Sequence, residues 1–473
     1  MSIKKQVSRS VFWSAIERFS VQVSSFILGI IIARLLCPDD YALIAMLNIF
    51  MALAQSFIDS GFANALIQKK DRSNLDYSTV FYFNIIISVI LYILLYNSAP
   101  FIAKFYNQSE LIQITRIVGI SLIINSFGIV QQAKLTVELD FKRQAKGSLV
   151  AVLISGIIGI IMAMKGFGVW ALVVQTLMNN LIKVILYWVY AKWKPLFAFS
   201  YNSFKELFSF GSKLLLSGLM HTVYVNLYTL IIGKRFLPAD LGFYNRAFSL
   251  AQFPSNNITN ILIRAIYPIQ CNIQDQHQLL KDSFVKYLRL SCLIVFPLML
   301  TLCALAEPLV LLILKDKWAG VIPLLRILCI SFMWDPVMRI NNSILQVKKR
   351  SDYTLYAEIL KKISAFVILF ATLGFGVEIM CYGLIIYSLI DIIIIIAFSK
   401  KVIGLGLFDQ IQIISPILFI SLFSSIVMYL TTLLFVNSFI QIIVALITGF
   451  IILLICCYKF MYDDILLVKS LKG

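Results

Sequence analysis

Charged residues are scarce in this chain. Asp, Glu, Lys and Arg make up only 14% of its 473 residues, whereas 60% of the residues are hydrophobic. A soluble globular protein carries about 25% charged residues, so this chain cannot cover a water-exposed surface. Long apolar runs separated by short polar stretches are typical of a protein that crosses a membrane many times. The composition therefore predicts an all-α polytopic membrane protein.

Residues that bind metals or form disulfides are also few or scattered. The chain has two histidines, His221 and His277, and eight cysteines with no C-x-x-C spacing among them. This distribution indicates small buried residues rather than a metal site or a disulfide framework. Walker, HExxH and GxSxG motifs are absent from the sequence, and the predicted connections are too short to hold a catalytic domain. We therefore expect no metal, no cofactor and no enzymatic activity.

Acidic residues are fewer than basic residues, and the formal net charge is +18. A basic balance can indicate nucleic-acid binding, but the sequence holds no basic, aromatic nucleic-acid-binding module. Membrane proteins concentrate Lys and Arg in cytoplasmic loops, and here they concentrate on the side that would hold both termini. We therefore expect cytoplasmic termini and no nucleic-acid partner.

Apolar segments long enough to cross a bilayer divide the sequence. Because a spanning helix needs about 20 mostly apolar residues, we predict about fourteen of them. Their predicted ranges are 11–36, 40–66, 78–99, 110–134, 147–165, 169–191, 206–233, 241–270, 281–306, 319–346, 355–374, 378–400, 411–435 and 439–459.

Three pairs of stretches resemble each other in the same order along the chain. Residues 33–46 read "ARLLCPDDYALIAM" and residues 233–246 read "GKRFLPADLGFYNR". The stretch "ITRIVGIS" at 114–121 similarly matches "LLRILCIS" at 324–331, and "GFGV" occurs at both Gly166 and Gly374. Chance similarity among Leu- and Ile-rich helices is the alternative, but the shared order favours a duplication.

The duplicated unit would hold six spanning helices. Since six is an even number, both copies would enter the membrane from the same side and form parallel repeats. The predicted domains are an N-terminal lobe at 1–200, a C-terminal lobe at 201–402 and two additional helices with a cytoplasmic tail at 403–473. We expect the two lobes to surround a central cleft.

Several predicted spans contain charged residues. A charge at the bilayer centre costs about 2.5–3.5 kcal/mol on insertion scales, so such residues should face a bundle interior or a watery cavity. Asp335 and Arg339 have the i,i+4 spacing of a salt bridge that could be purely structural. Others lie near helix ends and could extend to the interface: Arg34, Lys183, Lys213, Arg264 and Lys361. Because basic residues outnumber acids within the spans, a cavity lined by them would attract anions such as phosphate.

Longer stretches carry a resemblance to a known family. They include "ARLLCPDDYALIAM", "ALIQKKDRSNLDYSTVFYFN", "GFGVWALV", "LFSFGSKLLLSGL" and "IIGKRFLPADLGFYNRA". From about residue 8 to about residue 400 the chain resembles the polysaccharide-transport branch of the multidrug/oligosaccharidyl-lipid/polysaccharide (MOP) flippases, the Wzx-type exporters of lipopolysaccharide, O-antigen or colanic acid. It departs from the usual pattern at Cys37, where a small hydroxyl residue is common, and at Ala42, where Gly is common.

The resemblance implies a fold and an activity. The fold would be two six-helix lobes that work by alternating access in a bacterial inner membrane. The substrate would be a polyprenyl-diphosphate-linked oligosaccharide, and the polysaccharide polymerase machinery would be a further contact besides the membrane lipids. On this interpretation we assign the diphosphate to Arg18, Arg246, Arg289 and Arg339. Charge balance, or the binding of a coupling proton or Na⁺, is assigned to Glu17, Asp59 and Asp335.

Other functions are open on the sequence alone. A drug or cation antiporter with the same fold would need an acid-lined cavity, which the basic excess disfavours. A membrane polysaccharide polymerase or ligase would need a large extracytoplasmic loop or a catalytic domain. A lipid II flippase is a closer alternative, which only substrate assays separate from the exporter.

Overall fold

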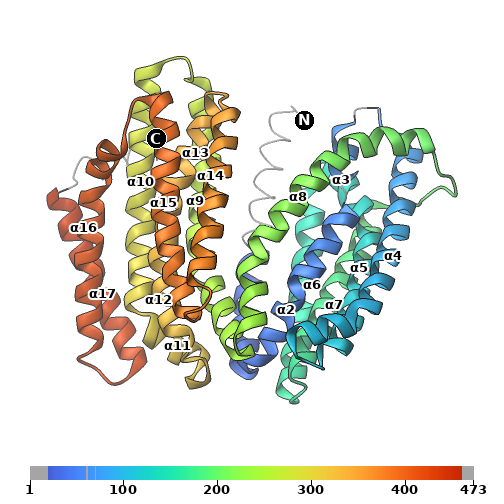
Figure 1. Ribbon diagram of the computed structural model, residues 1–473, viewed down its shortest axis with the longest axis horizontal. Coiled ribbons are helices and arrows are strands. Elements are labelled where there is room, and N and C mark those ends of the chain that lie inside the picture. The colour runs from blue at the N-terminus through green and yellow to red at the C-terminus, as the bar shows by residue number, and fades with distance from the viewer. Residues whose placement is uncertain (1–19, 60–61, 70, 461–473) are drawn as a thin grey trace. The chain divides into compact units, whose positions relative to one another are not determined.

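The computed structural model describes residues 20–59, 62–69 and 71–460. Throughout these ranges the regular elements are helices, and no strand occurs in them (Figure 1). The chain forms two compact units, Met1–Gly242 (unit 1) and Phe243–Gly473 (unit 2).

Unit 1 contains the helices of the first half of the chain. They are Ser20–Leu35, α2 (Pro38–Asp59), α3 (Phe62–Gln68), α4 (Asn74–Tyr106), α5 (Leu111–Val137), α6 (Phe141–Met164), α7 (Val169–Ala191) and α8 (Tyr201–Arg235). Helix α5 packs against both α4 and α7, and α6 packs against α7. Helix α8 packs against α2, α3 and α4, and it therefore belongs to unit 1.

Unit 2 begins within α9 (Pro238–Asn272). Its further helices are α10 (His277–Ala304), α11 (Ala306–Leu314), α12 (Val321–Phe332), α13 (Asp335–Val347), α14 (Ser351–Thr372), α15 (Val377–Ile403), α16 (Leu407–Thr432) and α17 (Ser438–Phe460). Helix α15 packs against α12, α13 and α14. The two C-terminal helices attach to this unit because α16 packs against α10 and α17 packs against α11 and α16.

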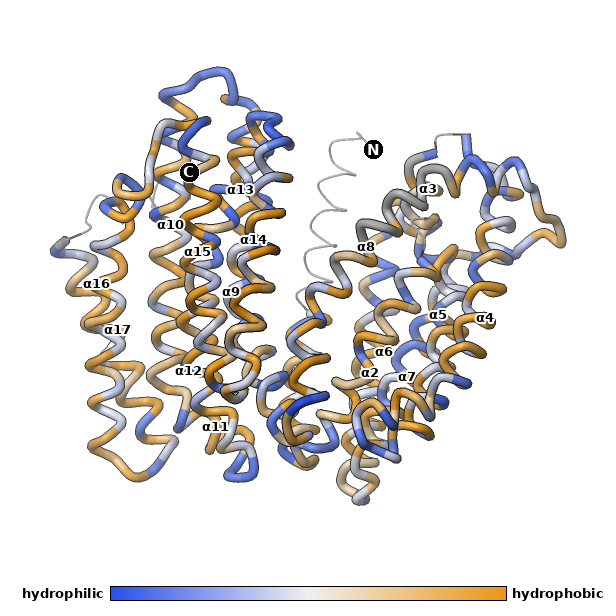
Figure 2. Tube along the Cα trace, viewed as in Figure 1, coloured by the Kyte–Doolittle hydropathy of each residue, from blue (hydrophilic) through white to orange (hydrophobic). Residues whose placement is uncertain are grey.

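The helices have the composition of membrane spans. Hydrophobic residues dominate their middle parts, and hydrophilic residues gather mainly at the connecting turns (Figure 2). Ten described helices are long and apolar enough to cross a membrane, and α12 and α13 together count as one of them, Val321–Val347. The predicted all-α membrane class is thus confirmed, whereas the number of fourteen spans stays a prediction.

The predicted spans lie on helices, with two differences in detail. The predicted helix 40–66 comprises α2 and α3, and the predicted helix 319–346 is divided by a turn at Met333 and Trp334. Pro336 follows this second division, and proline favours the first turn of a new helix because it has no N–H to donate. The part of the first predicted span before residue 20 lies outside the described residues.

The two copies of the quoted motif have the same local structure. One helix ends at Leu35 and α2 begins at Pro38; 200 positions later α8 ends at Arg235 and α9 begins at Pro238. At both breaks the first helix ends with an equivalent backbone hydrogen bond. Leu36 N–H donates to the Ile32 carbonyl at 2.9 Å, and Phe236 N–H donates to the Ile232 carbonyl at 3.0 Å. The repeated proline thus starts the second helix at each break. The domain boundaries expected at 200 and 402 stay predictions.

Candidate functional site

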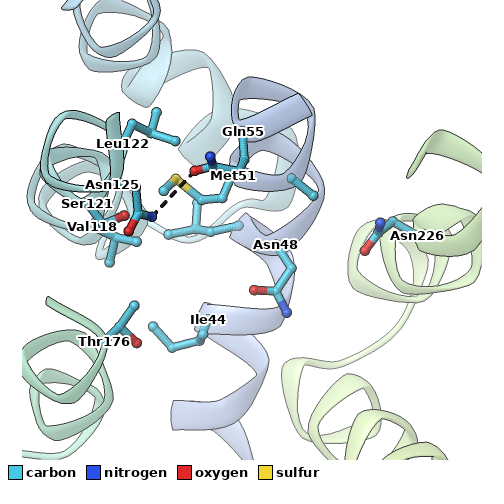
Figure 3. Close-up of a pocket in the computed structure, with 12 residues that line it drawn as sticks. Ile44, Asn48, Met51, Gln55, Val118, Ser121, Leu122, Asn125, Thr176 and Asn226 are labelled. Carbon is cyan, nitrogen blue, oxygen red and sulfur yellow. Dashed lines mark hydrogen bonds between the residues drawn. The ribbon is translucent and has the colours of Figure 1, made fainter. Parts of the chain in front are cut away.

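Unit 1 contains a cavity of about 430 Å³. Side chains from α2, α5, α7 and α8 surround it, and Figure 3 shows polar groups of several of these helices around the same space. Its lining residues are Ile44, Leu47, Asn48, Met51, Ala52, Gln55, Val118, Ser121, Leu122, Asn125, Thr176 and Asn226.

A second cavity of about 280 Å³ adjoins the first, and both are lined by Gln55 and Asn125. Its other lining residues come from the later turns of α2, α5 and α7. They are Asp59, Gly128, Ile129, Gln132, Asn180, Lys183, Val184 and Tyr187. The two cavities together form a polar region inside unit 1, which we call the amide cleft.

Helical periodicity explains why polar residues of one helix reach the same cleft. On α2, Asn48, Gln55 and Asp59 are separated by seven and four residues, so an α-helix places them on one face. The lining residues of α5 and of α7 recur at similar spacings, for example Thr176, Asn180 and Lys183. Helices α2, α5 and α7 therefore each present several polar side chains on the face toward the cleft.

The amides of the cleft are linked by hydrogen bonds. Asn125 Nδ2 donates to Gln55 Oε1 at 3.4 Å, and Gln55 Nε2 donates to Asp59 Oδ1 at 2.9 Å (the first bond is dashed in Figure 3). Asn226 Nδ2 donates to the Thr222 carbonyl of its own helix at 2.9 Å. Because each amide carries two N–H donors and an acceptor oxygen, these bonds leave hydrogen-bonding capacity for a ligand.

One acidic and one basic side chain line the cleft. Among the lining residues only Asp59 and Lys183 carry formal charges, one of each sign. The predicted accumulation of basic side chains is therefore not a property of these two cavities. Asp59 is the predicted site residue that the structure places here.

Four other predicted site residues lie in unit 2, and two of them, Asp335 and Arg339, form a cluster with α9. Arg339 Nε lies 3.8 Å from Asp335 Oδ2, which confirms the predicted i,i+4 salt bridge. The guanidinium also donates to Asn256 Oδ1 at 2.6 Å and to Asn260 Oδ1 at 3.2 Å. The Ser255 hydroxyl donates to Asp335 Oδ2 at 3.3 Å and to the Phe332 carbonyl at 2.8 Å. Arg339 is thus held in place while its side chain stays 39% exposed.

The remaining predicted residues are placed less specifically. Arg246 on α9 and Arg289 on α10 are both partly buried in unit 2. Glu17 and Arg18 lie outside the described residues.

Sequence reasoning missed two polar features because it considered mainly isolated charges. The first is the amide cleft, whose signal is the recurrence of Asn and Gln at helical spacing within apolar segments. The second is a buried ion pair between Lys361 and Asp391, with Nζ and Oδ1 2.7 Å apart. Lys361 is only 5% exposed, so it does not extend to the membrane interface as its position near a helix end had suggested.

The fold matches that of a solved flippase. The structure titled lipid II flippase MurJ, in an inward closed conformation, aligns with a TM-score of 0.77 and 14% sequence identity, over 96% of this chain and 100% of that chain. This likeness and the ten apolar helices define the chain as a multi-pass membrane protein with a flippase-like fold.

Sequence comparisons then identify the family. Residues 31–323 match the family model described as polysaccharide biosynthesis protein. The teichuronic acid biosynthesis protein TuaB of Bacillus subtilis (strain 168) is 30% identical over 75% of this chain and 74% of its own length. The lipopolysaccharide biosynthesis protein WzxC of Escherichia coli (strain K12) is 24% identical over 76% of this chain and 74% of its own length. The chain therefore belongs to the polysaccharide biosynthesis protein family, which confirms the resemblance to the polysaccharide-transport branch of the MOP flippases.

Proposed function

We propose that this protein moves polyprenyl-diphosphate-linked oligosaccharide repeat units from the inner to the outer leaflet, for the synthesis of a surface polysaccharide. The observation that carries the proposal is an amide-lined cleft inside a membrane-spanning helical unit, in a chain of the polysaccharide biosynthesis family. The names of its relatives, which refer to teichuronic acid and lipopolysaccharide synthesis, support a saccharide substrate.

The physical task explains why such a cleft is needed. Polar groups that enter hydrocarbon without hydrogen-bonding partners each cost several kcal/mol, so the sugar chain cannot cross unaided. Side-chain amides inside the helical unit replace the lost water, while the polyprenyl tail stays among the lipid chains. Alternating access of two lobes, at 1–200 and 201–402, would then expose the bound headgroup first to one leaflet and then to the other.

The diphosphate requires cations. Our proposal assigns it to Arg18, Arg246, Arg289 and Arg339, because a guanidinium donates two parallel hydrogen bonds to phosphate oxygens. Arg339 is the best supported of these, since Asn256, Asn260 and Asp335 orient its partly exposed guanidinium. Glu17, Asp59 and Asp335 would balance these charges when the site is empty, or bind a coupling proton or Na⁺.

The same proposal includes the cellular setting. The protein would lie in a bacterial inner membrane with both termini in the cytoplasm, where its substrate is assembled. An outward-moving anion would gain about 2.3 kcal/mol per charge per 100 mV of membrane potential. The polysaccharide polymerase would receive the flipped unit on the outer side and is a candidate contact.

Deletion of the gene tests the function. Cells that lack the protein should lose one surface polysaccharide and accumulate the lipid-linked repeat unit on the cytoplasmic side. The purified protein in proteoliposomes should move this lipid between leaflets. Normal surface polysaccharide in the deletion strain, without accumulation of the lipid, would refute the proposal.

A drug or cation antiporter is the second candidate, because the fold is compatible with it. An organic cation would need an excess of acids in the cavity, whereas the amide cleft is lined by one acid, Asp59, and one base, Lys183. A polymerase, a ligase or a lipid II flippase would differ in its product. Increased drug sensitivity of the deletion strain with unchanged surface polysaccharide would favour the antiporter, and a general defect in cell-wall synthesis would favour the lipid II flippase.

A further inference from the structure

The amide cleft has a chemistry that differs from that of a phosphate site. Its lining comprises six side-chain amides: Asn48, Gln55, Asn125, Gln132, Asn180 and Asn226. An amide donates and accepts hydrogen bonds at neighbouring atoms, as does a sugar hydroxyl or an acetamido group. Phosphate oxygens only accept hydrogen bonds. The acceptor oxygens of the amides would therefore stay unused with a phosphate ligand.

The cleft also offers few cations to a phosphate group. Lys183 is the only formal cation among the lining residues, and Asp59 is the only formal anion. A diphosphate would therefore meet a single cation, together with an acid, in this lining. A neutral polar ligand needs no cation.

Apolar side chains complete the recognition surface. Ile44, Met51, Val118 and Leu122 line the larger cavity next to the amides, and Figure 3 shows Met51 beside the Asn125–Gln55 hydrogen bond. A sugar ring presents C–H groups as well as hydroxyls, so a mixed wall of this kind fits it. The volume of about 430 Å³ lies within the range of small-molecule sites, about 300–1,000 Å³.

We infer, on the basis of the proposed function, that the amide cleft of unit 1 binds uncharged sugar residues of the lipid-linked oligosaccharide. The diphosphate does not bind there. The cleft thus determines saccharide specificity, and it favours neutral hexoses and N-acetylhexosamines over sugars that carry a carboxylate.

Site-specific photocrosslinking in living cells tests the location. A benzophenone amino acid replaces Met51 in the cleft or, as a matched control, Leu94, an exposed apolar residue of α4. After irradiation, mild acid cleaves the bond between the sugar and the diphosphate. If the cleft holds the sugar, the Met51 adduct keeps the saccharide mass and loses the lipid, whereas the Leu94 adduct carries phospholipid or polyprenyl chains.

The opposite cleavage pattern would overturn the inference. A Met51 adduct that keeps the polyprenyl diphosphate and loses the sugar would place the lipid end of the molecule, next to the diphosphate, in the cleft. Absence of a saccharide adduct at Met51, in a strain where export depends on the protein, would also overturn it. Failure of the proposed function can be distinguished from failure of this inference, because deletion of the gene would then leave export unchanged.

Transport by reconstituted variants tests the recognition chemistry. Asn125→Leu keeps the approximate size of the side chain and removes its hydrogen bonds. Each lost hydrogen bond should weaken saccharide recognition by about 2- to 12-fold. Flipping of the cell's own lipid-linked oligosaccharide should therefore show a raised KM. The control Asn97→Leu alters an exposed amide of α4 that bonds its own helix, and it should leave the KM unchanged.

Inhibition by a sugar-free competitor distinguishes saccharide recognition by Asn125 from a general structural effect of the substitution. Polyprenyl diphosphate without sugar should inhibit the wild type and Asn125→Leu equally, because it makes no contact with the cleft. The inference fails if Asn125→Leu weakens inhibition by the sugar-free lipid as much as it raises the KM for the saccharide. It also fails if neither quantity changes.

Discussion

Lys361 of α14 and Asp391 of α15 form a buried ion pair in unit 2. Their Nζ and Oδ1 atoms lie 2.7 Å apart, and the two residues are 5% and 7% exposed. Glu358, one turn before Lys361, lies 3.6 Å from the same ammonium. Two charges are thus buried between neighbouring helices, where either would be costly without the other.

Removal of one partner of this pair should destabilise unit 2. We expect Lys361→Met to cost about 3–5 kcal/mol, because it leaves the Asp391 carboxylate buried without its cation. The double variant Lys361→Met/Asp391→Asn should recover most of this loss. Thermal unfolding of the purified protein in detergent measures both effects. Equal stability of the wild type and Lys361→Met would contradict the prediction.

Gly242 should tolerate no side chain. A Cβ atom there would lie 3.1 Å from the Pro38 Cα and closer still to the Pro38 carbonyl, which is backbone and cannot rotate away. We expect Gly242→Ala to cost about 1–3 kcal/mol, as overpacking typically does. Gly374→Ala is the control, since a Cβ there meets nothing within 4 Å. Melting temperatures of the two variants test this, and an equal change in both would argue against it.

A buried amide network should anchor α16 to the rest of unit 2. Gln410 of α16 and Asn341 of α13 exchange two hydrogen bonds of 2.9 and 3.0 Å, and Ser399 donates to Asn341 Oδ1 at 2.6 Å. Gln410→Leu leaves polar atoms of Asn341 without these partners, which should cost about 1–3 kcal/mol. Limited proteolysis should then release the C-terminal helices faster than in the control Gln412→Leu, whose side chain is exposed. The same cleavage rate in both variants would refute the anchoring role.

Lys69 should stabilise unit 1 in a pH-dependent way. Its ammonium contacts Glu206 at 2.8 Å and Asp76 at 3.2 Å, and mainly the hydrogen bond to Glu206 raises the pKa of Lys69 above the ordinary 10.5. The folded state therefore favours the charged form, so the stabilisation is complete below pH 10.5 and is lost as the pH rises through the raised pKa. We expect Lys69→Met to cost about 0.2–1 kcal/mol at pH 8, because Glu206 is largely exposed. Unfolding curves should show this difference at pH 8 and lose it at strongly alkaline pH.

Arg246 should be needed for export. If it binds the diphosphate as proposed, Arg246→Ala removes a charge-assisted hydrogen bond, worth about 1.5–3 kcal/mol, and should reduce transport at least about tenfold. Arg264→Ala, near the other end of α9, serves as the control. Surface polysaccharide and the amount of protein in the membrane fraction are measured together. Full export by Arg246→Ala at normal protein levels would remove this residue from the site.

The sequence predicted features that depend on local composition. The apolar length of each segment indicated the helices, and the repeated motif falls at predicted breaks between spans, at 36–40 and 233–241, because these signals lie within a few turns of one chain segment. The i,i+4 spacing of Asp335 and Arg339 likewise predicted a contact within a single helix, which the structure confirms. Their arrangement with Asn256 and Asn260 could not be predicted, because these asparagines lie on a different helix.

By itself, then, the sequence determined that this protein is a helical membrane protein with a repeated helix break, since hydropathy and proline act locally. Only the tertiary structure decided that Lys361 meets Asp391 and that Asn48, Asn125 and Asn180 of three helices line one cleft. Helical periodicity specifies which residues share a face, but it does not specify which other helix that face meets. That choice depends on the packing of whole helices, through contacts between residues far apart in the chain.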